Sequence, residues 1–134
     1  RIAEVGEIAK KYPRLRLIID HMGFARETMD DKAQAAVDRL LTLAPLPNVS
    51  VKVSAMPCFS SEAYPFRNLY DPIKRTIDGF GVARCFWGTD YSRLPDSYNY
   101  RQAVTMFTEE MGLSNSDLEA VMGDSFSRAM GWPT

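Results

Sequence analysis

The side chains best suited to chemistry stand where short apolar runs of the sequence end. Asp20 and His21 close one run, Lys52 and Ser54 close a second, and Asp90 closes a third. Imidazole and carboxylate groups serve widely as general acids and bases, and His21 is the only histidine in the chain. Because the carboxyl ends of parallel strands meet at one edge of a sheet, we expect His21 and Asp90 to lie on the same face.

Each of these residues also has a structural interpretation. His21 fits a histidine bonded to backbone at a strand-to-loop corner, and Asp90 fits a turn or helix-capping aspartate. Lys52 points away from its flanking valines, either into a barrel interior or into solvent. Asp20 fits a buried carboxylate that accepts hydrogen bonds from backbone amides.

Three arginines lie in the loops that follow the three runs. They are Arg26, Arg67 and Arg93. A guanidinium can bind a substrate carboxylate through two parallel hydrogen bonds, which makes these residues candidate substrate-binding groups. The alternative is that all three are solvated surface residues.

Hydrophobic periodicity predicts the elements that position these side chains. Apolar residues at helical spacing predict helices over 2–12, 31–44, 71–80 and 100–111, and two short helices over 114–122 and 126–130. Apolar runs rich in branched and aromatic residues predict strands over 15–21, 49–54 and 84–90. Alternating helices and strands indicate parallel strands joined by right-handed crossovers, which is an α/β architecture.

Composition excludes several classes of protein. The chain has 134 residues, 46% hydrophobic and 25% charged, with a net charge of −1, which is typical of a soluble globular domain. No apolar run reaches the roughly 18 residues of a membrane helix, and no basic stripe favours nucleic acid. The two cysteines, Cys58 and Cys85, form no C-x-x-C pair, which favours a reducing, cytoplasmic location. The expected partner is a small-molecule substrate.

The first residue and the strand count predict that the chain is part of a larger fold. Arg1 opens the sequence directly inside an amphipathic pattern. Three parallel strands cannot close a barrel and leave two exposed edges. We expect barrel-facing apolar residues to lack partners, which favours association, for example as a homo-oligomer. These residues are Ile18, Val51 and Phe86.

Four segments together carry a family resemblance. They are Ile18–Gly23 (IIDHMG), Asn48–Ser54 (NVSVKVS), Arg84–Tyr91 (RCFWGTDY) and Val121–Ser125 (VMGDS). In this order they resemble the C-terminal half of the amidohydrolase-related proteins, the second amidohydrolase group, which includes lactonases and decarboxylases. The resemblance extends over nearly the whole chain.

The resemblance implies a (β/α)8 TIM barrel of which strands six to eight are present. Residues 1–134 are then a partial domain without its N-terminal half, where the family carries a His-x-His pair. Asp90 matches the aspartate that binds a divalent metal and acts as general base. The expected metal is zinc. His21 matches the histidine that hydrogen-bonds the substrate carbonyl or helps to activate water. Some lactonases of the family work without metal, and Asp90 then acts as base alone.

The implied function is hydrolysis of a lactone or a similar carboxylated small molecule, with the isolated chain inactive. Two departures limit the inference. Phe24 stands where the pyrone-dicarboxylate lactonases carry an arginine, and Ala55 replaces a common glycine. The alternatives are a decarboxylase or hydratase of the same family and a non-catalytic α/β binding domain.

Overall fold

The computed structural model describes residues 1–93 and 98–133, apart from the side chain of Arg93. Three parallel strands form one sheet in the order β1–β2–β3, and helices alternate with them along the chain. The strands are β1 (Leu17–Ile19), β2 (Val49–Ser54) and β3 (Cys85–Gly88). The helices before β3 are α1 (Ile2–Lys11), α2 (Lys32–Leu41) and α3 (Tyr70–Phe80). The predicted α/β architecture is confirmed.

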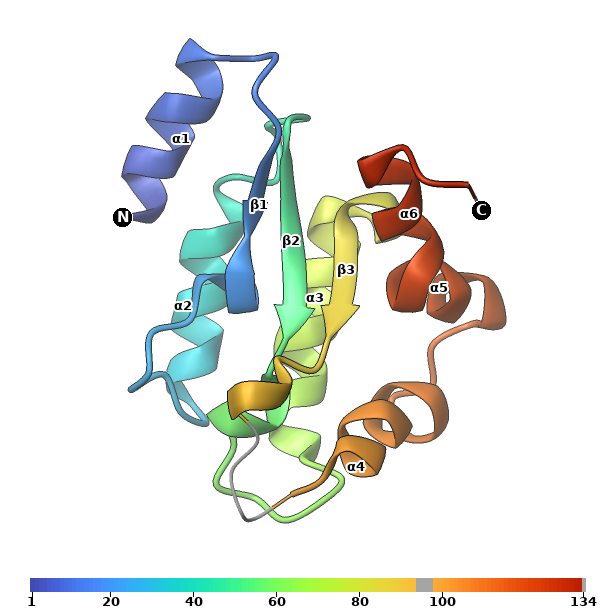
Figure 1. The fold of residues 1–134 in the computed structure, drawn as a ribbon. Helices are drawn as coiled ribbons and strands as arrows, with labels where there is room; N and C mark the ends of the chain where they lie inside the picture. The colour runs from blue at the N-terminus through green and yellow to red at the C-terminus, as the bar shows by residue number, and fades with distance from the viewer. Residues whose placement is uncertain (94–97, 134) are drawn as a thin grey trace.

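Helices α2 and α3 cover one face of the sheet. They lie behind it in Figure 1, and in the described part of the chain no helix crosses the front of β1 and β2. The alternate residues Val49, Val51 and Val53 of β2 are fully buried in the core that includes both helices. Burial of each valine contributes about 2 kcal/mol. Gly79 lets α3 approach α2, because a Cβ there would lie 2.4 Å from Leu41 Cδ2.

The prediction that Val51 faces the barrel interior is wrong. Alternation assigns Val51 to the same side as Val49 and Val53, and this side packs against the helices. Ile18 lies on the opposite side and is 41% exposed, as predicted. Phe86 also lies there but is buried, because the Phe126 ring packs edge-on against it at 5.4 Å.

Both outer strands are shorter than predicted. The expected strand 15–21 is extended only over Leu17–Ile19, and the expected strand 84–90 only over Cys85–Gly88. His21 and Asp90 have φ values of 51° and 52°, which no extended strand contains. The register pairs Lys52 with Phe86 and Ser54 with Gly88. The polar residues of interest therefore lie just beyond the strands or at their last positions.

The C-terminal third is helical. Helix α4 (Tyr100–Thr105) begins at Asn99, whose side chain forms a reciprocal capping box with Gln102, and continues as a π-helical turn over Met106–Glu110. Helices α5 (Asn115–Glu119) and α6 (Ser125–Met130) are joined by a π-helical turn over Ala120–Asp124. The predicted break between the last two helices at Gly123 is therefore wrong. Among the described residues, no helix has the length and apolar character needed to cross a membrane.

Candidate active site

The carboxyl ends of all three strands contribute to one polar cluster. The Nε2 atom of His21, directly after β1, lies 3.1 Å from Oδ2 of Asp90, just after β3. The Nδ1 atom of His21 lies 2.7 Å from Oγ of Ser54, the last residue of β2. The predicted meeting of His21 and Asp90 is therefore confirmed. Ser54 joins them as a third member.

Strained backbone at each strand end aims these side chains. His21, Met22, Ala55 and Asp90 all adopt left-handed φ values between 51° and 55°. This conformation costs a non-glycine residue about 1–2 kcal/mol, so the surrounding packing must hold it in place. Ala55, at the position where the family resemblance implies a glycine, keeps the left-handed backbone that glycine favours. The departure at Ala55 therefore leaves the turn after β2 intact.

The three side chains differ in their access to solvent. Ser54 is fully buried, while the side chains of His21 and Asp90 are 18% and 25% exposed. An ionised carboxylate only accepts hydrogen bonds, so Nε2 of His21 donates to Asp90. The roles in the Ser54 contact depend on the tautomer of the ring: a neutral ring that donates through Nε2 leaves Nδ1 to accept from the hydroxyl of Ser54. A small molecule can approach Asp90 and His21, whereas Ser54 is buried and its hydroxyl contacts the His21 ring.

An ion pair lies next to this cluster. Nζ of Lys52 lies 3.0 Å from Oδ1 of Asp20. A Cβ added to Gly88 would be 3.3 Å from both Lys52 Cε and Ser54 Cβ, so the Lys52 chain passes over Gly88 beside Ser54. Asp20 is mostly exposed and pairs with a side chain, so the predicted buried carboxylate bonded to backbone amides is wrong. Lys52 faces the open side of the sheet, one of its two predicted positions.

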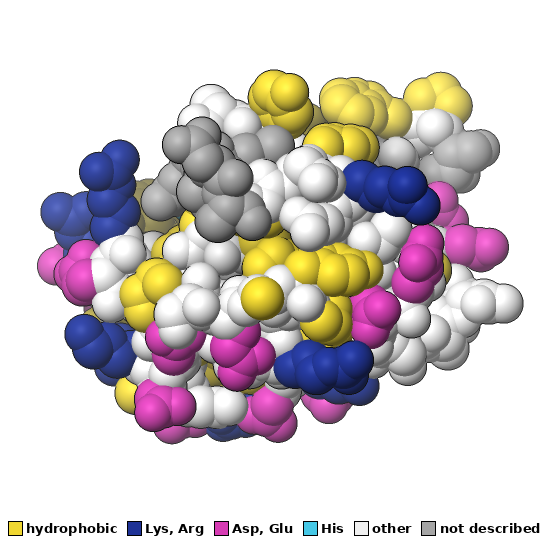
Figure 2. Space-filling view, turned by 90° about the horizontal axis from the view of Figure 1, so that it is seen from below, with side chains coloured by type: hydrophobic (Ala, Val, Ile, Leu, Met, Phe, Trp, Pro, Cys, Tyr) yellow, Lys and Arg dark blue, Asp and Glu magenta, His cyan; other side chains and the backbone are white. Residues whose placement is uncertain are grey.

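The pair lines an open cavity of about 360 Å³ on the front of the sheet. The other lining residues are Ile18, Phe86, Trp87 and Phe126. Seen from the carboxyl ends of the strands, Lys and Arg side chains are interspersed with Asp and Glu along the sides and the lower edge of the view, and hydrophobic side chains lie near the middle and along the upper edge (Figure 2). A mixed distribution of this kind does not favour a polyanion such as nucleic acid.

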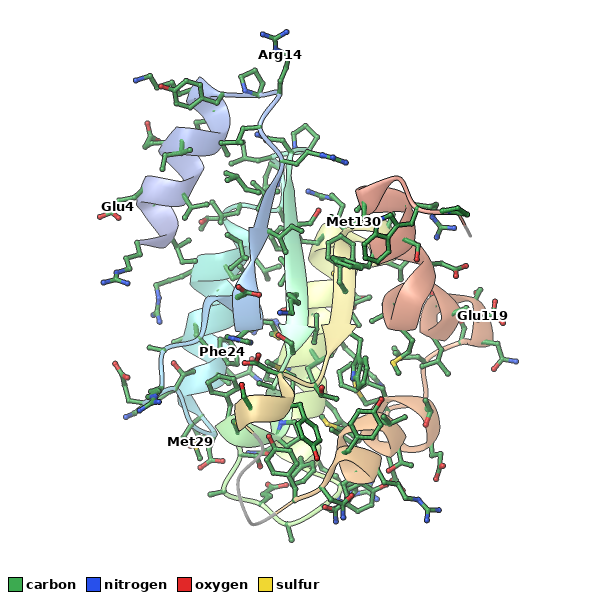
Figure 3. All side chains as sticks on the ribbon, viewed as in Figure 1. Glu4, Arg14, Phe24, Met29, Glu119 and Met130 are labelled. Atoms are coloured by element: carbon green, nitrogen blue, oxygen red, sulfur yellow. The ribbon has the colours of Figure 1, made fainter. Side chains whose placement is uncertain are left out.

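The loops beyond the strands pack on one another. Phe24 lies beyond the carboxyl end of β1 (Figure 3), and its ring meets that of Phe59 edge-on at 5.2 Å. Asp30 accepts hydrogen bonds from the backbone and hydroxyl of Ser61 and from Asn68, which hold the pKa of its carboxyl below the usual value. The loop after β1 is thereby fixed to the loop after β2. Phe24, the second departure from the family pattern, serves packing here.

Of the three arginines predicted to bind substrate, the structure describes the side chains of two, and both are exposed. Arg67 lies 3.5 Å from Glu110, and its side chain is 68% exposed. Arg26 is exposed in the loop between β1 and α2. The side chain of Arg93 lies outside the described residues. Their roles stay predictions.

The sequence analysis gave no site role to Ser54 and left two positions open for Lys52. The signal that could have grouped them is the alternation of β2, which places Ser50, Lys52 and Ser54 on the side opposite the valines.

The described residues do not by themselves complete a zinc site. Catalytic zinc takes three protein ligands and a water, and structural zinc takes four. His21 and Asp90 offer two ligands, and no cluster of three His, Cys, Asp or Glu side chains occurs in residues 1–93 and 98–133. Metal binding at Asp90 therefore stays a prediction.

Solved structures share this fold. An amidohydrolase from Burkholderia multivorans, crystallised with bound zinc, superimposes with a TM-score of 0.83 at 22% identity, over 98% of this chain and 49% of that one. A Pseudomonas putida protein provisionally assigned as a 2-pyrone-4,6-dicarboxylic acid hydrolase gives 0.74 at 24% identity, over 99% of this chain and 50% of that one. The three-stranded sheet thus matches about half of TIM-barrel amidohydrolase chains.

Sequence comparison agrees. An L-fucono-1,5-lactonase from Burkholderia ambifaria is 35% identical over 86 residues, which cover 62% of this chain and 28% of the lactonase. The chain thus corresponds to half or less of the length of these relatives. The family model described as amidohydrolase matches residues 1–125. The chain therefore belongs to the amidohydrolase family.

Proposed function

We propose that the site hydrolyses the ester bond of a lactone, with Asp90 as general base. The observation that carries the proposal is the contact between Asp90 and His21 at the carboxyl ends of β3 and β1, in a chain of a hydrolytic family. The relative named L-fucono-1,5-lactonase supports a lactone as the substrate. No observation favours decarboxylation or hydration, and both are outcomes of the test below.

In the proposed reaction, Asp90 removes a proton from water while the water oxygen attacks the lactone carbonyl carbon. The carbonyl electron pair moves to its oxygen. The tetrahedral intermediate collapses, the ring C–O bond breaks, and the proton held by Asp90 passes to the leaving ring oxygen. The product is an open hydroxy acid. General base catalysis of this kind contributes about 10²–10⁴ in rate.

His21 has two successive roles in this proposal. Before reaction its Nε2–H donates to the ionised Asp90 and directs that carboxylate. When Asp90 takes the proton from water it becomes a weaker acceptor. The Nε2–H group can then turn to the negative charge that develops on the carbonyl oxygen. The electrophilic role predicted from the family resemblance thus fits a ring that initially contacts Asp90.

Lys52 supplies the positive charge that we propose for substrate binding. Its ammonium is held 3.0 Å from Asp20, and its chain runs beside Ser54 across Gly88. A partly exposed ammonium can donate hydrogen bonds to a substrate carboxylate or ring oxygen. Lys52 thereby joins Arg26, Arg67 and Arg93 among the proposed substrate-binding cations, as the one whose position beside the cluster is described.

Product analysis on the full-length protein tests the reaction class. We propose that catalysis needs the remaining strands of the barrel, so the isolated 134 residues are expected to be inactive. Aldonolactones and a pyrone dicarboxylate are incubated with the protein, and ring opening is followed by proton release and by NMR of the product. A hydroxy acid without carbon dioxide is expected. Release of carbon dioxide, or addition of water to a double bond, contradicts hydrolysis.

Metal removal tests the cofactor. A bound divalent ion would lower the pKa of its water to about 7 and so supply hydroxide at neutral pH. Dialysis of the full-length protein against EDTA and re-addition of Zn²⁺ distinguish the two versions. A loss of activity that Zn²⁺ restores supports a metal with ligands beyond those described here. Full activity without metal supports Asp90 acting alone.

A further inference from the structure

Ser54 is the least conspicuous member of the polar cluster, and its environment is unusual for a serine. It ends β2, is fully buried, and its hydroxyl lies 2.7 Å from Nδ1 of His21. A buried hydroxyl without a partner costs about 1–3 kcal/mol, so this contact matters to both groups. Burial keeps Ser54 from meeting a substrate. Any effect on the reaction must therefore pass through His21.

We propose that Ser54 is a positioning residue: its hydroxyl donates to Nδ1, and thereby keeps the ring proton of neutral His21 on Nε2, facing Asp90. The catalytic role of Ser54 rests on the proposed function. In that function Nε2–H turns from Asp90 to the carbonyl oxygen of the substrate, and the ring must be held at its other nitrogen, Nδ1, while it does so. The Ser54 contact provides that fixed point on the side of the ring away from Asp90.

A hydroxyl is suited to this position because it both donates and accepts. While the ring is neutral, Ser54 donates to the bare Nδ1. If His21 becomes an imidazolium, both nitrogens donate, and the same hydroxyl can rotate to accept. Alanine can do neither. Gly88 matters as well, because its missing side chain leaves space next to Ser54 Cβ.

The test is ¹⁵N NMR of the imidazole in the metal-free, full-length protein. His21 is the only histidine among these 134 residues, and its signals are assigned by their loss in His21→Gln. We expect a proton on Nε2 and an Nδ1 resonance typical of a hydrogen-bonded acceptor. In Ser54→Ala, the Nδ1 resonance should move to that of a nitrogen without a donor. In Asp90→Asn, where no carboxylate biases the ring, the Nε2–H form should persist and become a mixture once Ser54→Ala is added.

Ser50→Ala is the matched control. Ser50 lies on the same face of the same strand, two alternate positions before Ser54, and should leave the His21 signals unchanged. Ser54→Thr retains the hydroxyl and should restore the wild-type signals. A wild-type ring protonated on Nδ1, or wild-type signals in Ser54→Ala, would overturn the proposal.

Kinetics separate this proposal from the proposed function. If the protein is a lactonase, Ser54→Ala should lower kcat about 10-fold with little change in KM, since one positioning hydrogen bond is lost. Unchanged kcat in Ser54→Ala would contradict the positioning role. If the wild type hydrolyses no lactone, the proposed function fails, while the NMR result still decides whether Ser54 sets the state of the ring.

Discussion

The two ends of the sheet use polar side chains in opposite ways. At the amino ends of the strands, side chains bond to backbone. The guanidinium of Arg84 donates to the carbonyls of Ala44, Leu46, Val49 and Phe80 at 2.8–3.0 Å. At the carboxyl ends, His21, Asp90 and Ser54 bond to one another and His21 and Asp90 remain partly exposed. Figure 3 shows the two ends, with Met130 near the first and Phe24 near the second.

Asn48 repeats the pattern at the amino end. Its amide nitrogen lies 2.9–3.3 Å from the carbonyls of Ala9, Tyr12 and Leu15, which ties α1 to the start of β2. These contacts use both amide hydrogens of Asn48 and most of the guanidinium donors of Arg84. Side chains that bond each other on a strained backbone can instead exchange partners when a ligand arrives. The partners of a polar residue, more than its type, therefore indicate whether it serves structure or can meet a ligand.

The largest effect is expected at Asp90. Replacement by asparagine removes the proposed base without changing the side-chain shape, so kcat in the full-length protein should fall about 10³-fold. The midpoint of thermal unfolding should change little. Asp78→Asn, at an exposed position of α3, is the control and should keep full activity. Turnover that survives Asp90→Asn would remove the main difference between the two ends.

Arg84→Met should have the largest effect on stability. The substitution leaves backbone carbonyls at the amino end without their charged donor, and we expect the free energy of unfolding to fall by about 3 kcal/mol. Urea titration measures this loss. The kcat/KM of the folded fraction should be unchanged. Arg39→Met, on the exposed side of α2, should cost little. A loss of activity in folded Arg84→Met would show that the amino end also serves function.

Lys52→Met should have the opposite effect to Arg84→Met: substrate binding should weaken while stability changes little. The Lys52–Asp20 pair is partly exposed, and such pairs contribute about 0–1 kcal/mol to stability. Loss of the ammonium should raise KM about 10-fold, the value of one charge-assisted hydrogen bond. Lys74→Met, at an exposed position of α3, is the control. An unchanged KM would mean that Lys52 only neutralises Asp20.

Local patterns predicted the order of helices and strands, because apolar spacing depends on neighbouring residues. They failed where the backbone departs from its regular form. His21 and Asp90 adopt left-handed conformations although neither is a glycine, so nothing at these positions indicates where the strands end, and both strands were predicted too long. The π-helical turn around Gly123 likewise continues a helix that the glycine was expected to end.

The candidate site was predictable only in part, because the local pattern locates strand ends but not the contacts of each side chain. Strand ends located His21 and Asp90, since parallel strands bring their carboxyl ends together. Alternation along β2 showed which residues share a side but not which side meets the helices, and Val51 was therefore assigned wrongly. The partner of Ser54 and three of the four partners of Arg84 are distant in sequence, and nothing in the neighbourhoods of these residues specifies them.

The smallest effect is expected at Cys85, the first residue of β3, whose side chain is fully buried. Burial raises the pKa of this thiol to about 12, so at pH 8 about one molecule in 10⁴ carries the reactive thiolate. Iodoacetamide should therefore modify Cys85 only as fast as the protein unfolds. Mass spectrometry of Cys58→Ala protein, in which Cys85 is the one remaining cysteine of these 134 residues, measures the rate.

The same pKa shift fixes the sign of a pH effect. The folded state favours the neutral thiol, so its stabilisation is complete below about pH 9 and is lost as the pH rises toward 12. Stability should fall over this range in the wild type and fall less in Cys85→Ala, measured by urea titration at pH 8 and 10.5. Rapid labelling of the folded protein at pH 8 would show that the amino end opens to solvent. The contrast between a buried, backbone-bonded amino end and a partly exposed polar cluster at the carboxyl end would then not hold.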